Sequence, residues 1–355
     1  MSVGVVALLY VGIACSVRST TPDLWKGGTS FEWRPSSTGR ALGPQLAFMG
    51  PSGAAGASIQ ELFTSNLRGT DRRERTHDGH TRFLPHFSPD GRRIVYTKYL
   101  QGNYGSAGAV TAVGVYDLAN ARETLLTNDG VAVQPVWSPD GRRIAYGNLS
   151  GDGIWIMNAD GSGAHRIARP AQTPGDMWWG DYLWSSDNWL YFSVAQKIDG
   201  CFKVRIDRMR PDGSGRAKID QGGPNCTPNG LQQSGDADPG ISPDGKTLYS
   251  SRGLPQTVRG APTVTIRHLY AFSSAPFYPG KIETDLSAKT KPNCVVGVPK
   301  VSPGGTEILV FLFCLNDRQH IGITATDPRG KRWTFIEPGF GADWNLSIPS
   351  PSFRS

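Results

Sequence analysis

Histidine, carboxylate and guanidinium groups gather in one short stretch of the sequence. His77, Asp78, His80 and His86 lie within ten residues of one another, with Arg82 between them. Such groups can move protons or hold a metal ion when the fold brings them together. Their spacing matches no metal-binding signature, and polar loop histidines are the ordinary alternative. We name His80, Arg82 and His86 as candidate binding residues and assign no catalytic residue.

A second unusual stretch combines tryptophans with carboxylates. Asp176, Trp178, Trp179 and Asp181 follow one another closely, just before Tyr182. Flat aromatic side chains beside carboxylates suit the faces and hydroxyl rims of sugar rings, and tryptophan is also enriched in protein–protein hot spots. The alternative is that the tryptophans pack between structural units. We expect a binding role for this stretch.

Three further aspartates and a tryptophan complete the candidate site: Asp236, Asp238, Asp343 and Trp344. A ring of carboxylates would suit a cation such as Ca²⁺, which prefers oxygen ligands. No calcium-loop motif accompanies them, so we expect no metal ion and no cofactor. The sequence also contains no Gly-x-Ser-x-Gly, His-Glu-x-x-His or Gly-rich phosphate loop, the motifs of serine hydrolases, zinc proteases and nucleotide-binding enzymes.

A recurring turn organises the chain that carries these residues. Ser-Pro-Asp-Gly follows an apolar run at Ser88, Ser138 and Ser242, and altered copies begin at Ser185 and Ser302. Pro-Asp-Gly favours a tight turn, and the flanking β-branched and aromatic residues favour strands. A second turn, Asp-Gly-Ser-Gly, follows within the same unit at 160–163 and 212–215. Each unit of about fifty residues therefore predicts four strands, which is typical of one propeller blade.

These repeats resemble the TolB-like PD40 family over about residues 40–355, most clearly at Trp137-Ser-Pro-Asp-Gly and at 158–163. The resemblance implies an all-β fold, a six-bladed β-propeller of four-stranded blades at residues 41–355. We expect the C-terminal strand, at 348–353, to complete the first blade and close the ring, with 31–35 as the alternative. We expect no counterpart of the N-terminal α/β domain of TolB, so a Tol–Pal role is not carried over.

The fold implied by this resemblance sorts the loops onto two faces. The tight turns share one face, whereas the long segments 100–112, 170–182, 222–238 and 252–263 all belong to the other. Long loops on a rigid scaffold are where function usually lies. We therefore expect a non-catalytic binding scaffold that engages a protein or peptide through this face. The alternative is a carbohydrate-active propeller, either a glycan binder or a metal-assisted polysaccharide lyase.

The five cysteines and the first residues bear on the cellular compartment. Residues 1–15 resemble a bacterial lipoprotein leader that ends at Cys15, the candidate lipidation site, and 16–40 form a linker. The alternative is a cleaved leader with an ordinary cysteine. The implied fold places the other four cysteines on the loop-bearing face, so we expect two disulfides, Cys201–Cys226 and Cys294–Cys314. These features predict export to the periplasm, the exterior or a lipid-anchored place in the envelope.

The charge distribution limits the partners. The formal net charge is +7, with an isoelectric point of about 9.2. The basic residues are scattered and form no stripe interleaved with aromatic residues, the pattern expected of a nucleic-acid interface. We expect a monomer that binds no nucleic acid and reaches a membrane only through a lipid anchor.

Overall fold

Strands make up the regular structure of this chain. The computed structural model describes residues 45–51, 59–67, 69–104, 106–169, 176–198, 201–220, 233–256, 264–314, 317–344 and 347. Every regular element among these residues is a strand, so the chain is all-β as expected. In chain order the strands are β1 (Leu46–Pro51), β2 (Gln60–Ser65), β3 (Arg73–Glu74), β4 (Arg82–Phe87), β5 (Arg93–Gln101), β6 (Val110–Asp117), β7 (Arg122–Leu125), β8 (Ala132–Trp137), β9 (Arg143–Asn148), β10 (Ile154–Asn158), β11 (His165–Ala168), β12 (Asp176–Trp184), β13 (Leu190–Ile198), β14 (Cys201–Met209), β15 (Ala217–Lys218), β16 (Gln233–Ile241), β17 (Thr247–Gln256), β18 (Val264–Ser273), β19 (Glu283–Asp285), β20 (Cys294–Val301), β21 (Ile308–Cys314), β22 (Asp317–Thr326), β23 (Trp333–Glu337) and β24 (Phe340–Trp344).

The strands associate in antiparallel groups of four, which we call quartets. Quartet 1 has the order β24-β1-β2-β3, quartet 2 the order β4-β5-β6-β7 and quartet 3 the order β8-β9-β10-β11. The remaining strands form quartets 4 (β12–β15), 5 (β16–β19) and 6 (β20–β23). Short parallel pairings of β14 with β16 and of β18 with β20 join these three quartets into one larger sheet.

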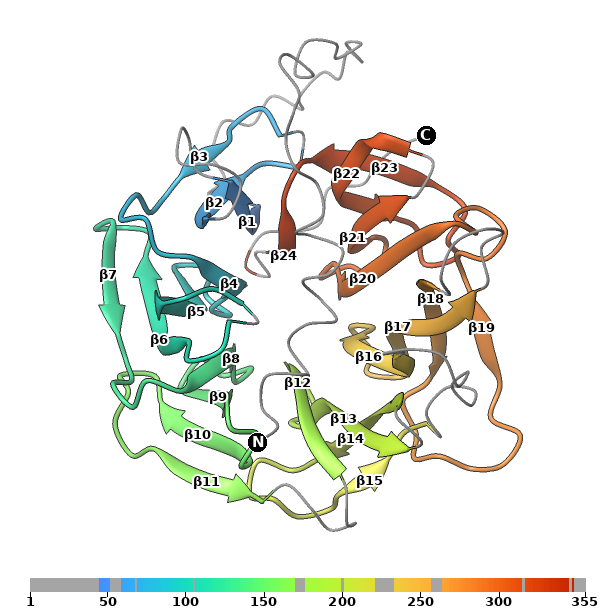
Figure 1. The fold of residues 1–355 in the computed structure, drawn as a ribbon, viewed down its shortest axis with the longest axis horizontal. Coiled ribbons are helices and arrows are strands. Elements are labelled where there is room, and N and C mark those ends of the chain that lie inside the picture. The colour runs from blue at the N-terminus through green and yellow to red at the C-terminus, as the bar shows by residue number, and fades with distance from the viewer. Residues whose placement is uncertain are drawn as a thin grey trace.

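The quartets are arranged around a common centre (Figure 1). The first strand of each lies innermost, and the innermost strands contact one another in a closed series: β24, β4, β8, β12, β16, β20 and again β24. The fourth strand of each quartet lies at the rim (Figure 1). This radial arrangement is that of a β-propeller.

The ring is closed by the C-terminal strand, which completes the quartet that the N-terminal strands begin. Strand β24 pairs antiparallel with β1, with Leu46 opposite Trp344 and Ala47 opposite Asp343. The expectation of C-terminal closure is confirmed, but the residues expected to provide it were wrong. Residues 340–344 occupy the free edge of β1, and 348–353 and 31–35 lie outside the described residues.

Side-chain hydrogen bonds explain why the Ser-Pro-Asp-Gly turns recur. In quartet 3, the Ser138 hydroxyl donates to Asp140 Oδ1 at 2.6 Å and accepts the Arg143 backbone N–H at 2.9 Å. Gly141 adopts a φ of 68°, a conformation that glycine reaches without steric cost. The same serine–aspartate contact forms in the other copies that keep the aspartate, at Ser88, Ser185 and Ser242.

The innermost strands share a bulge. Leu84, Gln134, Asp238 and Val298 each precede a proline and have φ between 50° and 55°. Strand pairing shifts register at each of these positions. Proline donates no hydrogen bond to a ladder, so a bulge is where an inner strand tolerates it.

The apolar core lies between adjacent quartets. One cluster, for example, packs Val95 and Val113 of quartet 2 against Trp137 and Ile144 of quartet 3. The part of the chain that the structure describes contains no helix long and apolar enough to cross a membrane.

Candidate binding face and its buried ion pairs

Chain direction divides the molecule into two faces. The crossover face carries the starts of the innermost strands, the loops between second and third strands, and the connections between quartets. The turn face carries the Ser-Pro-Asp-Gly and Asp-Gly-Ser-Gly turns. Segments expected to be loops on the crossover face are partly strand, because β5 runs to Gln101 and β17 to Gln256. Among the described residues, extended hairpin strands therefore build part of this face.

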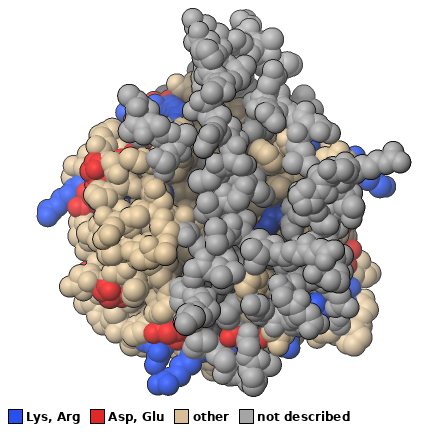
Figure 2. Space-filling model, viewed as in Figure 1, with Lys and Arg blue, Asp and Glu red and all other residues tan. Residues whose placement is uncertain are grey.

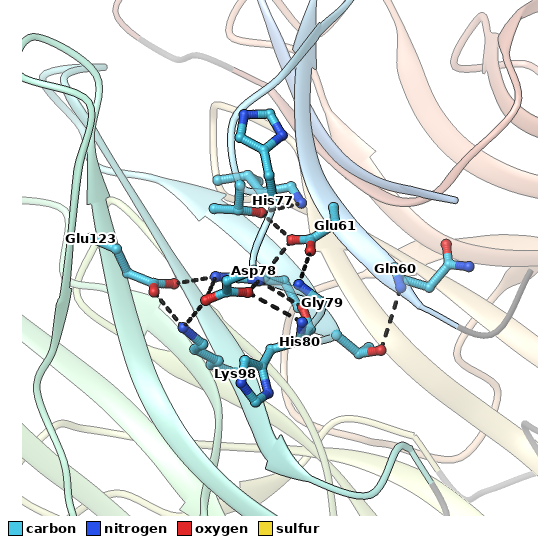
Figure 3. Close-up of polar contacts among 12 residues, drawn as sticks. Gln60, Glu61, His77, Asp78, Gly79, His80, Lys98 and Glu123 are labelled. Carbon is cyan, nitrogen blue, oxygen red and sulfur yellow. Dashed lines mark hydrogen bonds and ion pairs between the residues drawn. The ribbon is translucent and has the colours of Figure 1, made fainter. Parts of the chain in front are cut away.

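Arg82, at the start of β4, is the centre of an ion-pair network. Its partners Glu61, Asp78 and Glu123 lie close together with Lys98 in Figure 3. Its guanidinium contacts Glu61 at 2.7 Å, Glu123 at 2.8 Å and Asp78 at 3.0 Å. Lys98 pairs with Asp78 and Glu123 from the neighbouring strand β5. The side chain of Arg82 is 1% exposed and that of Glu61 0%. The network therefore joins quartets 1 and 2 through the fully buried Arg82–Glu61 pair, and Asp78 and Glu123 extend it towards the solvent.

The charges of this network stabilise one another. Burial alone would raise the pKa of Asp78, but the hydrogen bonds from Arg82 and Lys98 hold that pKa far below its usual value. Glu123 behaves alike: burial opposes its ionisation, yet Lys98 and Tyr96 lower the pKa of its carboxyl. Asp78 and Glu123 are thus acceptors for the cations, and a carboxylate with a lowered pKa is a poor general base at neutral pH.

Quartet 5 repeats this arrangement with the charge on the innermost strand reversed and a cation kept on the second strand. Asp236 on β16 stands where Arg82 stands on β4, and Arg252 on β17 stands where Lys98 stands on β5. Arg252 contacts Asp236 at 2.5 Å and Glu283 at 2.5 Å. Asp238, on the same strand, accepts the Val298 N–H and lies 3.6 Å from Arg267. Asp236 and Asp238, both candidates from the sequence, are therefore bound by other residues of the protein.

Quartet 4 contains a third network, built around Arg205. Asp176, a candidate from the aromatic–acidic stretch, contacts the Arg205 guanidinium at 2.8 Å. Asp207 bridges Arg205 and Arg216, at 2.9 Å from each. Strand β12 also contains Trp178, Trp179 and Asp181, whose side chains lie outside the described part of the structure. Tyr182 is buried in the core between quartets 3 and 4.

The remaining candidates join the closing strand to its neighbours. Asp343 accepts the Phe87 N–H at 2.9 Å and lies 3.6 Å from His86 Nδ1. Trp344 donates from its indole to the Lys300 carbonyl at 2.8 Å. His80 is apart from this group, with Nδ1 3.0 Å from the Tyr99 carbonyl. The candidate residues therefore lie at separate places in the fold and do not form one site. Among the described residues, no three His, Cys, Asp or Glu side chains are arranged to hold a metal ion.

Comparison with known proteins agrees with this architecture. Over 116 residues, 32% of the chain, the sequence is 36% identical to the Tol-Pal system protein TolB of Anaeromyxobacter dehalogenans strain 2CP-C. The match covers 25% of that protein, so the chain spans about a quarter of the length of the curated relatives it matches. No protein-family model matches the chain.

Solved structures extend the similarity to most of the chain. TolB from Acinetobacter baumannii aligns with a TM-score of 0.61 and 15% identity, over 85% of this chain and 66% of that one. The putative TolB from Agrobacterium tumefaciens aligns with a TM-score of 0.55 and 15% identity, over 87% and 94%. This chain carries a TolB-like β-propeller. At such identity the structural likeness shows the fold alone, because propellers support many unrelated functions.

The TolB-like propeller contains one of the two expected disulfides within its described residues. Cys294 and Cys314 are bonded across the neighbouring strands β20 and β21, as predicted. Cys226 and Cys15 lie outside the described residues, as does the side chain of Cys201. The confirmed disulfide ties the start of an innermost strand to the end of its partner at the crossover face.

A tryptophan that the sequence analysis did not single out is half-buried on the crossover face. Trp155, on β10, donates from its indole to Asp152 at 3.2 Å, and the Arg166 guanidinium lies 5.7 Å from its ring centroid. Arg166 and Asp152 also approach to 3.6 Å. Strand alternation was the available signal, because Ile154 and Ile156 pack into the core between quartets 3 and 4 and place Trp155 on the opposite side of the strand. There Trp155 packs partly against the cluster between quartets 2 and 3 and stacks on Tyr146.

Replacing His268 by glutamine is expected to destabilise the TolB-like propeller more at pH 6 than at pH 9. His268 Nδ1 lies 2.7 Å from Asp285. Burial alone would lower the pKa of His268, but Asp285 outweighs it and holds that pKa above 6.5. The stabilisation is therefore complete below pH 6.5 and is lost as pH rises through the raised pKa. A charged hydrogen bond contributes about 2 kcal/mol.

Urea titrations of the wild type and the variant at both pH values measure this difference. His86 provides a control of opposite sign, because burial lowers its pKa. A neutral replacement of His86 should therefore gain stability, relative to the wild type, as pH falls below 6.5. A His268→Gln effect that is equal at the two pH values would contradict the ion pair.

Proposed function

We propose that this chain is an extracytoplasmic, non-catalytic binding scaffold that engages a protein or peptide partner through its crossover face. We also infer that the six quartets are six blades of one closed propeller, since the innermost strands contact one another in a closed series. The disulfide supports an oxidising compartment, and similarity to TolB supports a place in the bacterial envelope.

The observation that carries this proposal is the way buried charges fix the crossover face. Arg82, Arg205 and Arg252, which belong to quartets 2, 4 and 5, are each held by carboxylates, and the Glu61 partner of Arg82 comes from quartet 1. Because these arginines are held in ion pairs, they fix the positions of the strand starts and of the hairpins that extend from them. A rigid set of strands carrying projecting hairpins is the arrangement on which proteins commonly build binding surfaces.

The hairpins on the crossover face differ in length, so its surface is uneven. Strands β5 and β9 both begin directly after the turn of their quartets, but β5 has nine residues and β9 only six. At about 3.3 Å per residue, β5 extends roughly 10 Å further than β9. Quartet 3 is therefore lower than quartet 2 at the crossover face, and it bears Trp155, Asp152 and Arg166.

These three side chains form our proposed anchor for the partner. Asp152 is 42% exposed and Arg166 29%, so both can contact another molecule. Tryptophan and arginine are enriched among the residues that dominate protein–protein affinity. Acidic and basic side chains are interspersed around the rim of the molecule (Figure 2), which favours a mixed polar partner over a polyanion.

The test compares partner capture by matched variants. Photo-crosslinking from the crossover face, followed by affinity measurement on the captured protein, should show that Trp155→Ala weakens binding about 30-fold or more. Trp333→Ala is the control, since Trp333 is a half-buried tryptophan on the rim strand β23. The Trp178→Ala/Trp179→Ala variant tests the second aromatic group on β12.

Equal binding by the wild type, the Trp155 variant and the Trp178/Trp179 variant would overturn the proposal. A carbohydrate lyase is the competing outcome. It would raise the ultraviolet absorbance of an acidic polysaccharide, and that activity would disappear on His80→Ala or His86→Ala.

A further inference from the structure

A cavity opens on the turn face, away from the proposed partner surface. It has a volume of about 340 Å³ and is lined by Arg143, Asn188, Arg210, Pro211 and Asp212. Arg143 begins β9 of quartet 3, and the other four residues belong to the two turns of quartet 4. The cavity therefore lies at the junction of these quartets.

Both arginines lie over tryptophan rings. The Arg143 guanidinium carbon lies 5.1 Å from the ring centroid of Trp184, and that of Arg210 lies 3.7 Å from the ring centroid of Trp189. A guanidinium stacked on an aromatic ring keeps its N–H edge available in a fixed plane. The tryptophans thus pre-orient two cationic donor groups beside one cavity.

The hydrogen-bonding capacity of these arginines is largely unused within the described residues. No hydrogen bond from the Arg143 guanidinium is formed there. Arg210 uses Nη1 for the carbonyls of Asp187 at 2.8 Å and Asn188 at 3.2 Å, which leaves Nε and Nη2. The cavity therefore contains two guanidinium groups with unused donors beside one carboxylate. Such paired guanidinium groups are typical of anion-binding sites.

The other walls add one donor and one acceptor. Asn188 accepts the Trp184 indole N–H on Oδ1 at 2.9 Å, so its amide nitrogen remains as a donor. Asp212 accepts the Ser214 N–H on Oδ1 at 2.9 Å and also interacts with the Ser214 hydroxyl and the Arg210 charge. A carboxylate has about four acceptor sites, so it can still accept from a further donor. The site therefore offers donors for an oxyanion beside one acceptor for a hydroxyl group.

We propose that this cavity binds the phosphate of a small hydroxylated phosphomonoester, such as a glycerol or sugar phosphate. Two guanidinium groups and an amide match the three terminal oxygens of a phosphate, whereas a carboxylate offers only two. Asp212 would accept a hydrogen bond from a hydroxyl of the ligand. The site is separate from the proposed partner surface, so either proposal can fail without the other.

Departures from the repeat create the site. In quartet 4, Asn188 takes the left-handed turn position, with a φ of 65°, that Gly141 takes in quartet 3. Arg210 replaces Asn158 at the start of the second turn. The junction between quartets 2 and 3 has only one of the two arginine–tryptophan contacts. There Arg93 lies 4.6 Å from the ring centroid of Trp137. Arg93 is therefore an internal control, an equivalent arginine without the second one.

Calorimetric titration of the whole chain with glycerol phosphate and inorganic phosphate, at constant ionic strength, tests the proposal. We expect saturable binding that weakens about tenfold for each of Arg143→Gln and Arg210→Gln. Arg93→Gln should bind as the wild type does. Asp212→Asn should reduce the preference for glycerol phosphate over inorganic phosphate. Vesicles containing phosphatidic acid distinguish a lipid-borne phosphate from the free compound.

Asn188→Gly is a second variant that preserves the turn, because glycine accepts the left-handed conformation. It should fold normally and bind phosphate several-fold more weakly. The proposal is overturned if phosphate shows no saturable binding, if Arg93→Gln weakens binding as much as Arg143→Gln, or if acetate binds as tightly as phosphate.

Discussion

Replacement of Arg82 by alanine should lower the free energy of unfolding by about 3–5 kcal/mol, because it leaves buried carboxylates without their cation. Glu61 is fully buried and would retain only the Thr76 hydroxyl at 2.5 Å and the Gly79 N–H at 2.9 Å. Glu123 would keep Lys98 and would suffer less. The loss should therefore arise chiefly at Glu61, on the quartet 1 side of the junction.

Two controls separate burial from charge pairing. Arg73 forms an ion pair with Asp71 at 2.9 Å in the same region, but both side chains are more than half exposed. Exposed pairs contribute about 0–1 kcal/mol, so Arg73→Ala should change stability little. The double variant Glu61→Met/Arg82→Met removes both charges and should recover much of the loss. Denaturant titrations of all variants measure these energies.

A small effect would contradict this account. If Arg82→Ala lies within about 1 kcal/mol of the wild type, water or a rearranged Lys98 must already compensate Glu61. If the double variant is no more stable than Arg82→Ala, lost packing rather than an unpaired charge causes the destabilisation.

Local chemistry made the turns predictable from the sequence. Ser138, Asp140 and Gly141 each perform a role that residue type alone defines: a hydroxyl bridge, a turn acceptor and a left-handed position. The spacing of such turns implied four-stranded units and a ring. The closing strand was harder to place, because 340–344 has no Ser-Pro-Asp-Gly turn after it to mark its end.

Long-range pairing made the site unpredictable. Asp236 and Asp238 were expected at the rim of a site, yet Arg252 and Arg267 neutralise them from neighbouring strands. Those partners are many residues distant, and only strand register brings them together. Extended hairpins were likewise taken for loops, because Gly- and Pro-rich composition around 252–263 masked the strands that enter it.

Trp344 shows how a predicted site residue can serve the fold instead. Its side chain is 3% exposed and packs with Leu46 and Phe48 of quartet 1 and with Leu309 and Ile323 of quartet 6. The indole N–H also reaches the carbonyl of a β20 residue. One side chain on the closing strand thus makes apolar contacts with quartets 1 and 6 and a hydrogen bond to quartet 6.

Trp344→Ala should consequently destabilise the propeller by about 3–5 kcal/mol, the usual loss for a buried aromatic side chain. Trp344→Phe keeps most of the packing and should lose only about 1 kcal/mol with the indole hydrogen bond. Denaturant titration measures both, and limited proteolysis should show early cleavage on either side of β24 in the alanine variant. Because β24 closes the ring by pairing with β1, cleavage confined to other segments would mean that the ring stays closed without Trp344.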